Sequence, residues 1–88
     1  GLDEYGSKIE EKAKKENKEP QVFVDEIAKK YLSAWKSLGI EYDGFIRTTS
    51  LKHKTGVLDF VKNLYNKGDI YEGEYAGLYC VVCENFVL

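Results

Sequence analysis

The 88-residue sequence has no methionine, one proline, one tryptophan, one histidine and only two cysteines. It also lacks an apolar run approaching the roughly 20 residues of a membrane span, and it has no charged-then-apolar leader. Two cysteines are too few for the disulfide framework of a small secreted domain. We therefore expect a cytoplasmic chain without a membrane partner, in which the cysteines carry metal or redox chemistry.

No charge of one sign dominates the sequence. Thirteen Lys and Arg stand against fifteen Asp and Glu, which gives a formal net charge of -2. Because no global positive field results, we expect no independent nucleic-acid binding. The 43% hydrophobic and 32% charged content excludes the composition of a disordered chain. At this length the chain supports one small domain at most.

Caps and apolar periodicity predict three helices, over residues 7–16, 20–38 and 51–67. Ser7 and Glu10 have the spacing of a capping box, in which each side chain satisfies a backbone N–H at the helix start. Pro20 suits a first helical turn, where its missing N–H costs nothing. Gly39 and Gly68 are placed to end the second and third helices, because glycine accepts the left-handed conformation there.

The second and third expected helices are amphipathic. In the second, apolar residues recur at three-and-four spacing from Val24 to Leu38 and predict a broad buried face. Its aromatic residues are interpreted as core and not as a ligand-binding box. The expected inner face of the third helix consists of Val57, Leu58, Phe60, Val61, Leu64 and Tyr65.

Short strands complete the expected fold. Residues 45–48 are β-branched and aromatic after an Asp-Gly turn signal, which predicts one strand. Residues 70–82 are aromatic and β-branched and contain two glycines, which predicts a strand pair with a turn. The fold class is therefore α/β and rich in helix.

Three stretches carry a resemblance to a known family. Residues 1–9 read GLDEYGSKI, similar to the pattern G-T-D-E-H-G-x-K-I, although Leu2 and Tyr5 depart from it. Residues 42–49 read YDGFIRTT and are followed by His53, similar to Y-D-x-F-I-R-T-T with a later His. Residues 68–84 read GDIYEGEYAGLYCVVCE, similar to G-D-I-Y-x-G-x-Y-x-G-W-Y-C-x-x-C-E. In this order and spacing, the stretches resemble methionyl-tRNA synthetases.

The resemblance implies an internal piece of a class I catalytic domain. Residues 1–69 would belong to the Rossmann-type domain, and residues 70–88 would open the zinc-binding connective insertion. The parent enzyme would activate methionine with ATP and transfer it to tRNA. The family's nucleotide signatures H-I-G-H and K-M-S-K-S do not occur in these 88 residues. We therefore expect the chain to be inactive alone.

One residue is expected to bind substrate. The resemblance implies that Asp3 faces the amino group of methionine, with which a carboxylate makes a charge-assisted hydrogen bond. The alternative is that Asp3 complements the dipole of the helix that follows. His53 lacks an identifiable nucleophile or orienting partner, so no catalytic residue is assigned.

Cys80 and Cys83 have the two-residue spacing with which neighbouring thiolates bind one zinc ion. They supply two of four ligands, and the resemblance implies that a second cysteine pair follows downstream. A redox pair and plain reduced thiols remain alternatives. A different class of function is a small zinc- or thiol-dependent interaction module, in which two copies share one metal through these cysteines.

Overall fold

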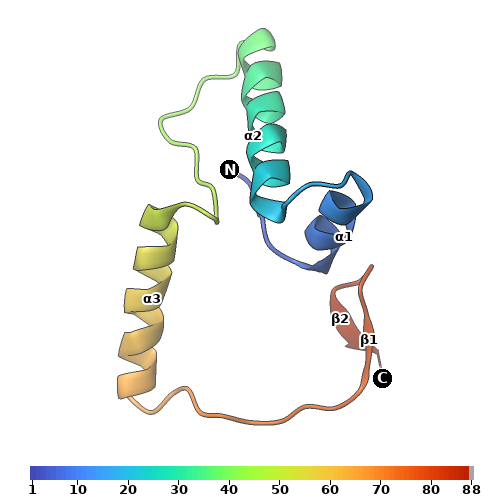
Figure 1. The fold of residues 1–88 in the computed structure, drawn as a ribbon. Coiled ribbons are helices and arrows are strands. Elements are labelled where there is room, and N and C mark those ends of the chain that lie inside the picture. The colour runs from blue at the N-terminus through green and yellow to red at the C-terminus, as the bar shows by residue number, and fades with distance from the viewer. Residues whose placement is uncertain (88) are drawn as a thin grey trace. The chain divides into compact units, whose positions relative to one another are not determined.

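The computed structural model describes residues 1–87, which form two compact units, the second beginning at Leu51. The elements are α1 (Ser7–Lys15) and α2 (Pro20–Ser37) in the first unit, and α3 (Leu51–Asn66), β1 (Leu78–Cys80) and β2 (Asn85–Val87) in the second (Figure 1). All three predicted helices are confirmed, each ending one residue before its predicted end. None of the helices in residues 1–87 has the length and apolar character needed to cross a bilayer.

All three helices end in the same way. The residue after each C-cap is left-handed, with φ of 55° at Asn17, 69° at Gly39 and 83° at Gly68. The next amide then bonds back into the last turn, as when the Ile40 N–H donates to the Trp35 carbonyl at 2.9 Å. This closure satisfies carbonyls that have no partner within the helix. The predicted stops at the two glycines are confirmed, and asparagine takes that role in α1.

The start of α1 differs from the prediction. Gly6 is the N-cap, with φ 119° and no side-chain hydrogen bond, and Ser7 is already the first helical residue. The predicted capping box of Ser7 and Glu10 is therefore wrong. Its physical reason is the turn at Gly6, whose positive φ suits glycine and places the boundary one residue earlier. Pro20 does occupy the first turn of α2, as predicted.

A small apolar core joins α1 to α2. Ala13, Phe23 and Val24 are buried, and Ile9 and Ile27 pack partly buried against them. Full burial of one such large side chain contributes about 1.5–3 kcal/mol. The core of the first unit therefore rests on a few residues of one helix pair.

The buried face of α2 is narrower than its apolar periodicity predicts. Leu38, at its C-terminal end, is 74% exposed. Trp35 is half-buried and meets Tyr42 and Phe45 edge-on, at ring-centroid distances of 5.7 and 5.4 Å. Trp35 thus packs within its own unit, whereas the C-terminal end of the apolar face of α2 remains at the surface.

Residues 45–48 do not form the predicted strand. Arg47 makes one isolated parallel bridge with Leu2. The Leu2 N–H donates to the Ile46 carbonyl at 2.9 Å, and the Thr48 N–H donates to the Leu2 carbonyl at 3.3 Å. Among the described residues, Leu2 is the only one that forms a β-bridge with this segment. The pairing therefore stops at a single bridge, and no strand forms. Its partner is a segment 45 positions earlier in the sequence.

No residue of α3 is buried in the part of the chain that the structure describes. Val57, Phe60 and Tyr65, from its expected inner face, are 45%, 65% and 66% exposed. The apolar periodicity correctly predicts the helix. The expected burial of this face is not observed within these residues.

β1 and β2 form an antiparallel hairpin, but its second strand lies later in the sequence than predicted. Cys80 pairs with Asn85, and residues 81–84 form the loop. Glu84 closes that loop with φ 52°. A four-residue loop with a left-handed last residue is a common hairpin connection. Residues 70–75 consequently remain outside the strands, and the Cys-x-x-Cys motif begins at the last residue of β1 and continues into the turn.

Candidate functional site

The first four residues lie against residues 46–49 through a series of backbone contacts. A Cβ added at Gly1 would stand 2.3 Å from the Ile46 carbonyl oxygen, so the close approach requires glycine. Leu2 uses both its N–H and its carbonyl in the parallel bridge. The Glu4 N–H then donates to the Thr48 hydroxyl oxygen at 2.8 Å. Both neighbours of Asp3 are thereby attached to the same segment.

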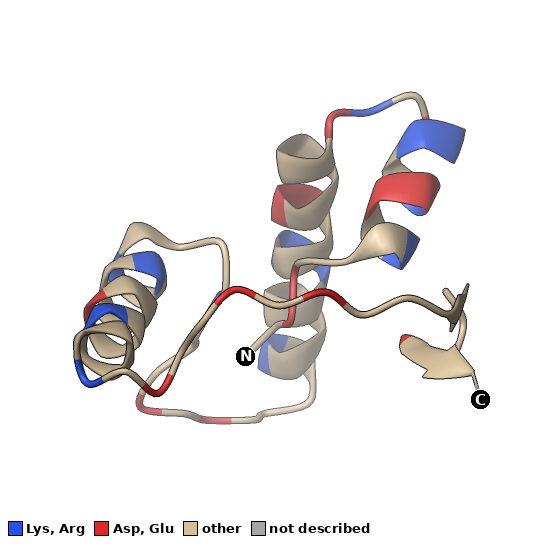
Figure 2. Ribbon diagram, turned by 90° about the horizontal axis from the view of Figure 1, so that it is seen from below, with Lys and Arg blue, Asp and Glu red and all other residues tan. Residues whose placement is uncertain are grey.

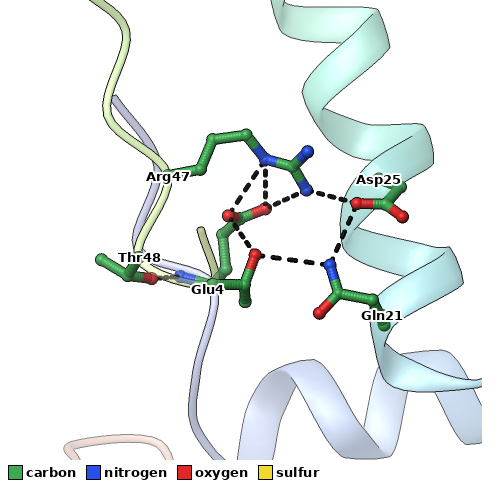
Figure 3. Close-up of polar contacts among 6 residues, drawn as sticks. Glu4, Gln21, Asp25, Arg47 and Thr48 are labelled. Atoms are coloured by element: carbon green, nitrogen blue, oxygen red, sulfur yellow. Dashed lines mark hydrogen bonds and ion pairs between the residues drawn. The ribbon is translucent and has the colours of Figure 1, made fainter. Parts of the chain in front are cut away.

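The Glu4 side chain is the buried charge of this region, with 2% exposure. Arg47 donates from Nε to both carboxylate oxygens at 3.1 Å and from Nη2 to Oε2 at 2.9 Å (Figure 3). The Thr49 hydroxyl donates to Oε1 at 2.9 Å. A buried carboxylate persists when it is paired and its remaining lone pairs are hydrogen-bonded. Both conditions are met here.

Two side chains of α2 close these contacts into a ring. Arg47 Nη2 donates to Asp25 Oδ1 at 2.6 Å, and Gln21 Nε2 donates to the same oxygen at 3.0 Å. Gln21 Nε2 also lies 3.3 Å from the Thr49 hydroxyl oxygen. The ring therefore runs from Glu4 through Arg47, Asp25, Gln21 and Thr49 back to Glu4 (Figure 3). It ties the N-terminal segment, α2 and residues 47–49 together.

The ring favours the charged forms of Asp25 and Arg47. Hydrogen bonding from Arg47, with a further bond from Gln21, lowers the pKa of Asp25 below its usual range. Hydrogen bonding to Glu4 and then to Asp25 raises the pKa of Arg47. Each shift has the sign expected when a charged form gains an opposite partner. The guanidinium is thus shared by two carboxylates.

Asp3 itself lies at the surface, on a cavity of about 470 Å³ in the first unit. Apolar side chains such as Phe23 and Ile27 line part of the cavity, together with Lys12 and Lys30. Charges of both signs lie along α1 and α2 (Figure 2). Within residues 1–87 no hydrogen bond or ion pair engages the Asp3 carboxylate. It is available to a ligand.

The position of Asp3 relative to the backbone is also informative. It directly follows Leu2, the residue paired in parallel with Arg47, and it precedes α1. Two parallel segments joined through α1 and α2 form a crossover connection. In parallel α/β sheets, ligands bind outside the carboxyl ends of the strands. Asp3 follows one residue of the single parallel bridge that the structure shows.

Cys80 is the last residue of β1, Cys83 lies in the hairpin loop, and neither forms a disulfide. The Cys83 N–H lies 3.4 Å from Cys80 Sγ and donates to it. Amide donation to sulfur supports a thiolate, the form that binds metal. Residues 1–87 contain no group of three or more His, Cys, Asp or Glu side chains placed to hold one ion. His53, on α3, contributes to no such group.

No role was predicted from the sequence for Glu4, Asp25 or Arg47. A signal for two of them was present, because Glu4 and Arg47 are charges of opposite sign inside the stretches 1–9 and 42–49. Nothing in the one-dimensional pattern indicated that these two stretches pair. Asp25 gave no signal, since it looks like any exposed acid on a helix.

Comparison with known proteins places this geometry in a family. A model of the family described as tRNA synthetases class I (M) matches residues 1–88. The chain therefore belongs to the class I tRNA synthetases of this family. Curated relatives include the methionine–tRNA ligases of Nostoc sp. (46% identical over 86 residues) and Deinococcus radiodurans (49% over 88 residues). The resemblance to methionyl-tRNA synthetases is thus confirmed.

The match covers nearly all of this chain but a small part of each relative. It spans 98% of the chain and 16% of the Nostoc protein, and 99% of the chain and 13% of the Deinococcus protein. The methionine–tRNA ligase of Fusobacterium nucleatum is 46% identical over 86 residues, 14% of its length. The chain thus corresponds to a minor portion of these relatives.

Proposed function

We propose that this chain supplies part of the amino-acid site of a methionine–tRNA ligase, with Asp3 receiving the α-ammonium group of methionine. Such an enzyme activates methionine with ATP and transfers it to tRNA. The carboxylate would hold the ammonium by a charge-assisted hydrogen bond and so orient the amino acid. Methionine, ATP and tRNA are then partners of the whole protein, in the cytoplasm.

One observation carries this proposal. The Asp3 carboxylate, without a protein partner in residues 1–87, follows the parallel-paired residue and borders a cavity. A carboxylate that only served α1 would need no cavity. The parallel crossover also supports the finer proposal that residues 1–69 belong to a Rossmann-type domain.

ATP chemistry is assigned to other parts of the full-length protein. H-I-G-H, K-M-S-K-S and phosphate-binding glycine motifs do not occur in these 88 residues. Activation requires ATP and methionine held together in one oriented site. The isolated chain is therefore expected to form no methionyl-adenylate, which an ATP–pyrophosphate exchange assay would test.

The test of the ammonium contact is Asp3→Asn in the full-length protein. Loss of one partner of a charge pair should raise the KM for methionine at least about tenfold in the exchange assay, while the KM for ATP changes little. Glu10→Gln is a matched control, because Glu10 is the acid in the first turn of α1. Equal effects of both variants would identify Asp3 as a helix-dipole acid and refute the proposal.

We also propose that residues 70–88 open a zinc-binding insertion and that Cys80 and Cys83 supply half of its ligands. Their donor chemistry fits, because zinc prefers thiolates and the Cys83 amide already donates to one sulfur. Zinc would serve as a structural crosslink of the hairpin turn to further ligands. In the full-length protein, Cys80→Ser with Cys83→Ser should abolish bound zinc and lower Tm. Zinc content equal to that of the wild type would contradict this assignment.

A further inference from the structure

We propose that Arg47 is a positioning residue for the amino-acid site, holding Asp3 in place by anchoring Glu4, its neighbour in the chain. This inference rests on the proposed function of Asp3. Arg47 does not touch Asp3 and is not a catalytic residue. It acts through the backbone of a segment whose other contacts leave Asp3 facing outward.

The segment that carries Asp3 is held by few contacts. The described contacts that hold residues 2–4 on the neighbouring segment are the Leu2 bridge, the Glu4 N–H bond to Thr48 and the Glu4 carboxylate contacts. The two backbone contacts fix where the segment lies. Arg47 contacts the Glu4 carboxylate at 2.9 to 3.1 Å, and these contacts fix how the segment is rotated about its own axis.

The guanidinium of Arg47 bridges two carboxylates. Arg47 contacts both oxygens of Glu4 and, through Nη2, an oxygen of Asp25 on α2. A rigid planar fork with several donors can do this, whereas the single ammonium of lysine cannot. Arg47 consequently joins this segment to α2 (Figure 3). Side chains of α2 such as Phe23 and Ile27 also line the cavity beside Asp3. Arg47 therefore sets the distance between the Asp3 carboxylate and α2.

A positioning role of Arg47 and a general stabilising role predict different effects on ligand binding. If Arg47 acts through Asp3, its loss should weaken only ligands that use the ammonium contact. The α-hydroxy acid analogue of methionine has the same side chain and carboxylate but no ammonium group. Loss of general stability would weaken both ligands alike.

The experiment measures the Kd of methionine and of this analogue with the full-length protein. Arg47→Met should weaken methionine at least about tenfold, as misplaced groups commonly do, and should weaken the analogue less than about twofold. Asp3→Asn should give the same selectivity. The double variant, Asp3→Asn with Arg47→Met, should lose no more discrimination between methionine and the analogue than either single variant. Both changes remove the same interaction.

Two further variants keep the test decisive if Arg47→Met does not fold. Arg47→Lys retains the charge beside Glu4 but loses the fork, and should reproduce most of the selective loss. Asp25→Asn keeps the Glu4 pair and removes a carboxylate that is 45% exposed, so a selective loss of at most about fivefold is expected. Glu26→Gln is the matched control, since Glu26 is another acid of α2, paired with Lys18 in the preceding loop, and its loss should change neither Kd.

The outcomes are distinct for the two proposals. Equal weakening of both ligands by the Arg47 variants, or no weakening of either, would overturn the positioning role while leaving the role of Asp3 intact. If Asp3→Asn itself fails to alter the discrimination, the ammonium contact is refuted first. Selective loss in both the Asp3 and the Arg47 variants, without additivity, supports both.

Discussion

The two units of this chain organise their side chains in opposite ways. The first buries a carboxylate, Glu4 at 2% exposure, within a closed ring of polar contacts beside a small apolar core. In the second, no residue of α3 is buried among the described residues, and Phe60 is 65% exposed. Apolar periodicity is present in both units, yet within residues 1–87 two helices pack against each other only in the first. An amphipathic pattern therefore predicts a helix more securely than it predicts what covers that helix.

The comparison also shows where specificity resides. Apolar contacts between α1 and α2 set the helix pair, but they tolerate changes of similar volume. The polar ring accepts few alternatives, because each member satisfies another and a lost partner leaves a buried charge. The candidate binding residue is adjacent to the polar ring. In the second unit, the Cys83 N–H donates to Cys80 Sγ and the Phe86 N–H to Asn85 Oδ1, contacts between near neighbours in the chain.

The largest expected effect tests the difference in burial between two phenylalanines. Phe23→Ala should lower the free energy of unfolding by about 3–5 kcal/mol, since Phe23 is 5% exposed in the α1–α2 core. Phe60→Ala should change it by less than about 0.5 kcal/mol if the α3 face stays exposed. Urea unfolding of the full-length protein measures both. A similar loss for both variants would show that another part of the protein covers α3.

A second pair of variants separates backbone conformation from packing. Gly39 has φ 69° and Gly56 lies within α3, and a Cβ added at either would meet nothing within 4 Å. Gly39→Ala should cost about 1 kcal/mol through the left-handed backbone. Gly56→Ala should stabilise by about 0.5–1 kcal/mol through helix propensity. Thermal unfolding decides the signs, and equal signs would contradict the backbone explanation.

The smallest expected effect concerns acid titration of α2. The pKa of Asp25 is lowered by its bond from Arg47, so its contribution to stability is present above its unfolded pKa, near 3.8. That contribution is lost as the pH falls through the folded pKa. Between neutral pH and a pH below about 4, the free energy of unfolding should therefore fall less in the Asp25→Asn variant than in the wild type. Carboxyl NMR titration would measure this directly. An Asp25 pKa at the ordinary value would contradict the ion pair.

The helices could be predicted because their signals are local. Apolar spacing, Pro20, Gly39 and Gly68 each act within a few residues of the element they specify. The strands could be predicted only in part, because pairing joins segments that a local pattern cannot connect. Residues 70–75 have β-forming composition, yet the partner of β1 is residues 85–87, beyond the turn of the cysteines.

The candidate site was predictable to a similar extent. Asp3, Cys80 and Cys83 were identified as candidate binding residues from sequence motifs. The ligands proposed for them stay predictions. The Glu4–Arg47 pair joins residues 43 positions apart, and no periodicity in a single sequence connects them. The same holds for Asp25, whose partner is set by the three-dimensional arrangement of α2. Local physics thus locates the elements, while the contacts between them depend on the folded chain.

The parallel bridge has a consequence for the order of folding. Leu2 and Arg47 come together by closing a loop that contains both α1 and α2, and such long-range closure is entropically slow compared with helix formation. Once the helix pair has formed, the remaining loop is effectively shorter, so the bridge and the ring should form after it. Asp3 would then reach its final place among the last residues of the first unit to become ordered. Mutations in the ring should accordingly speed unfolding more than they slow folding.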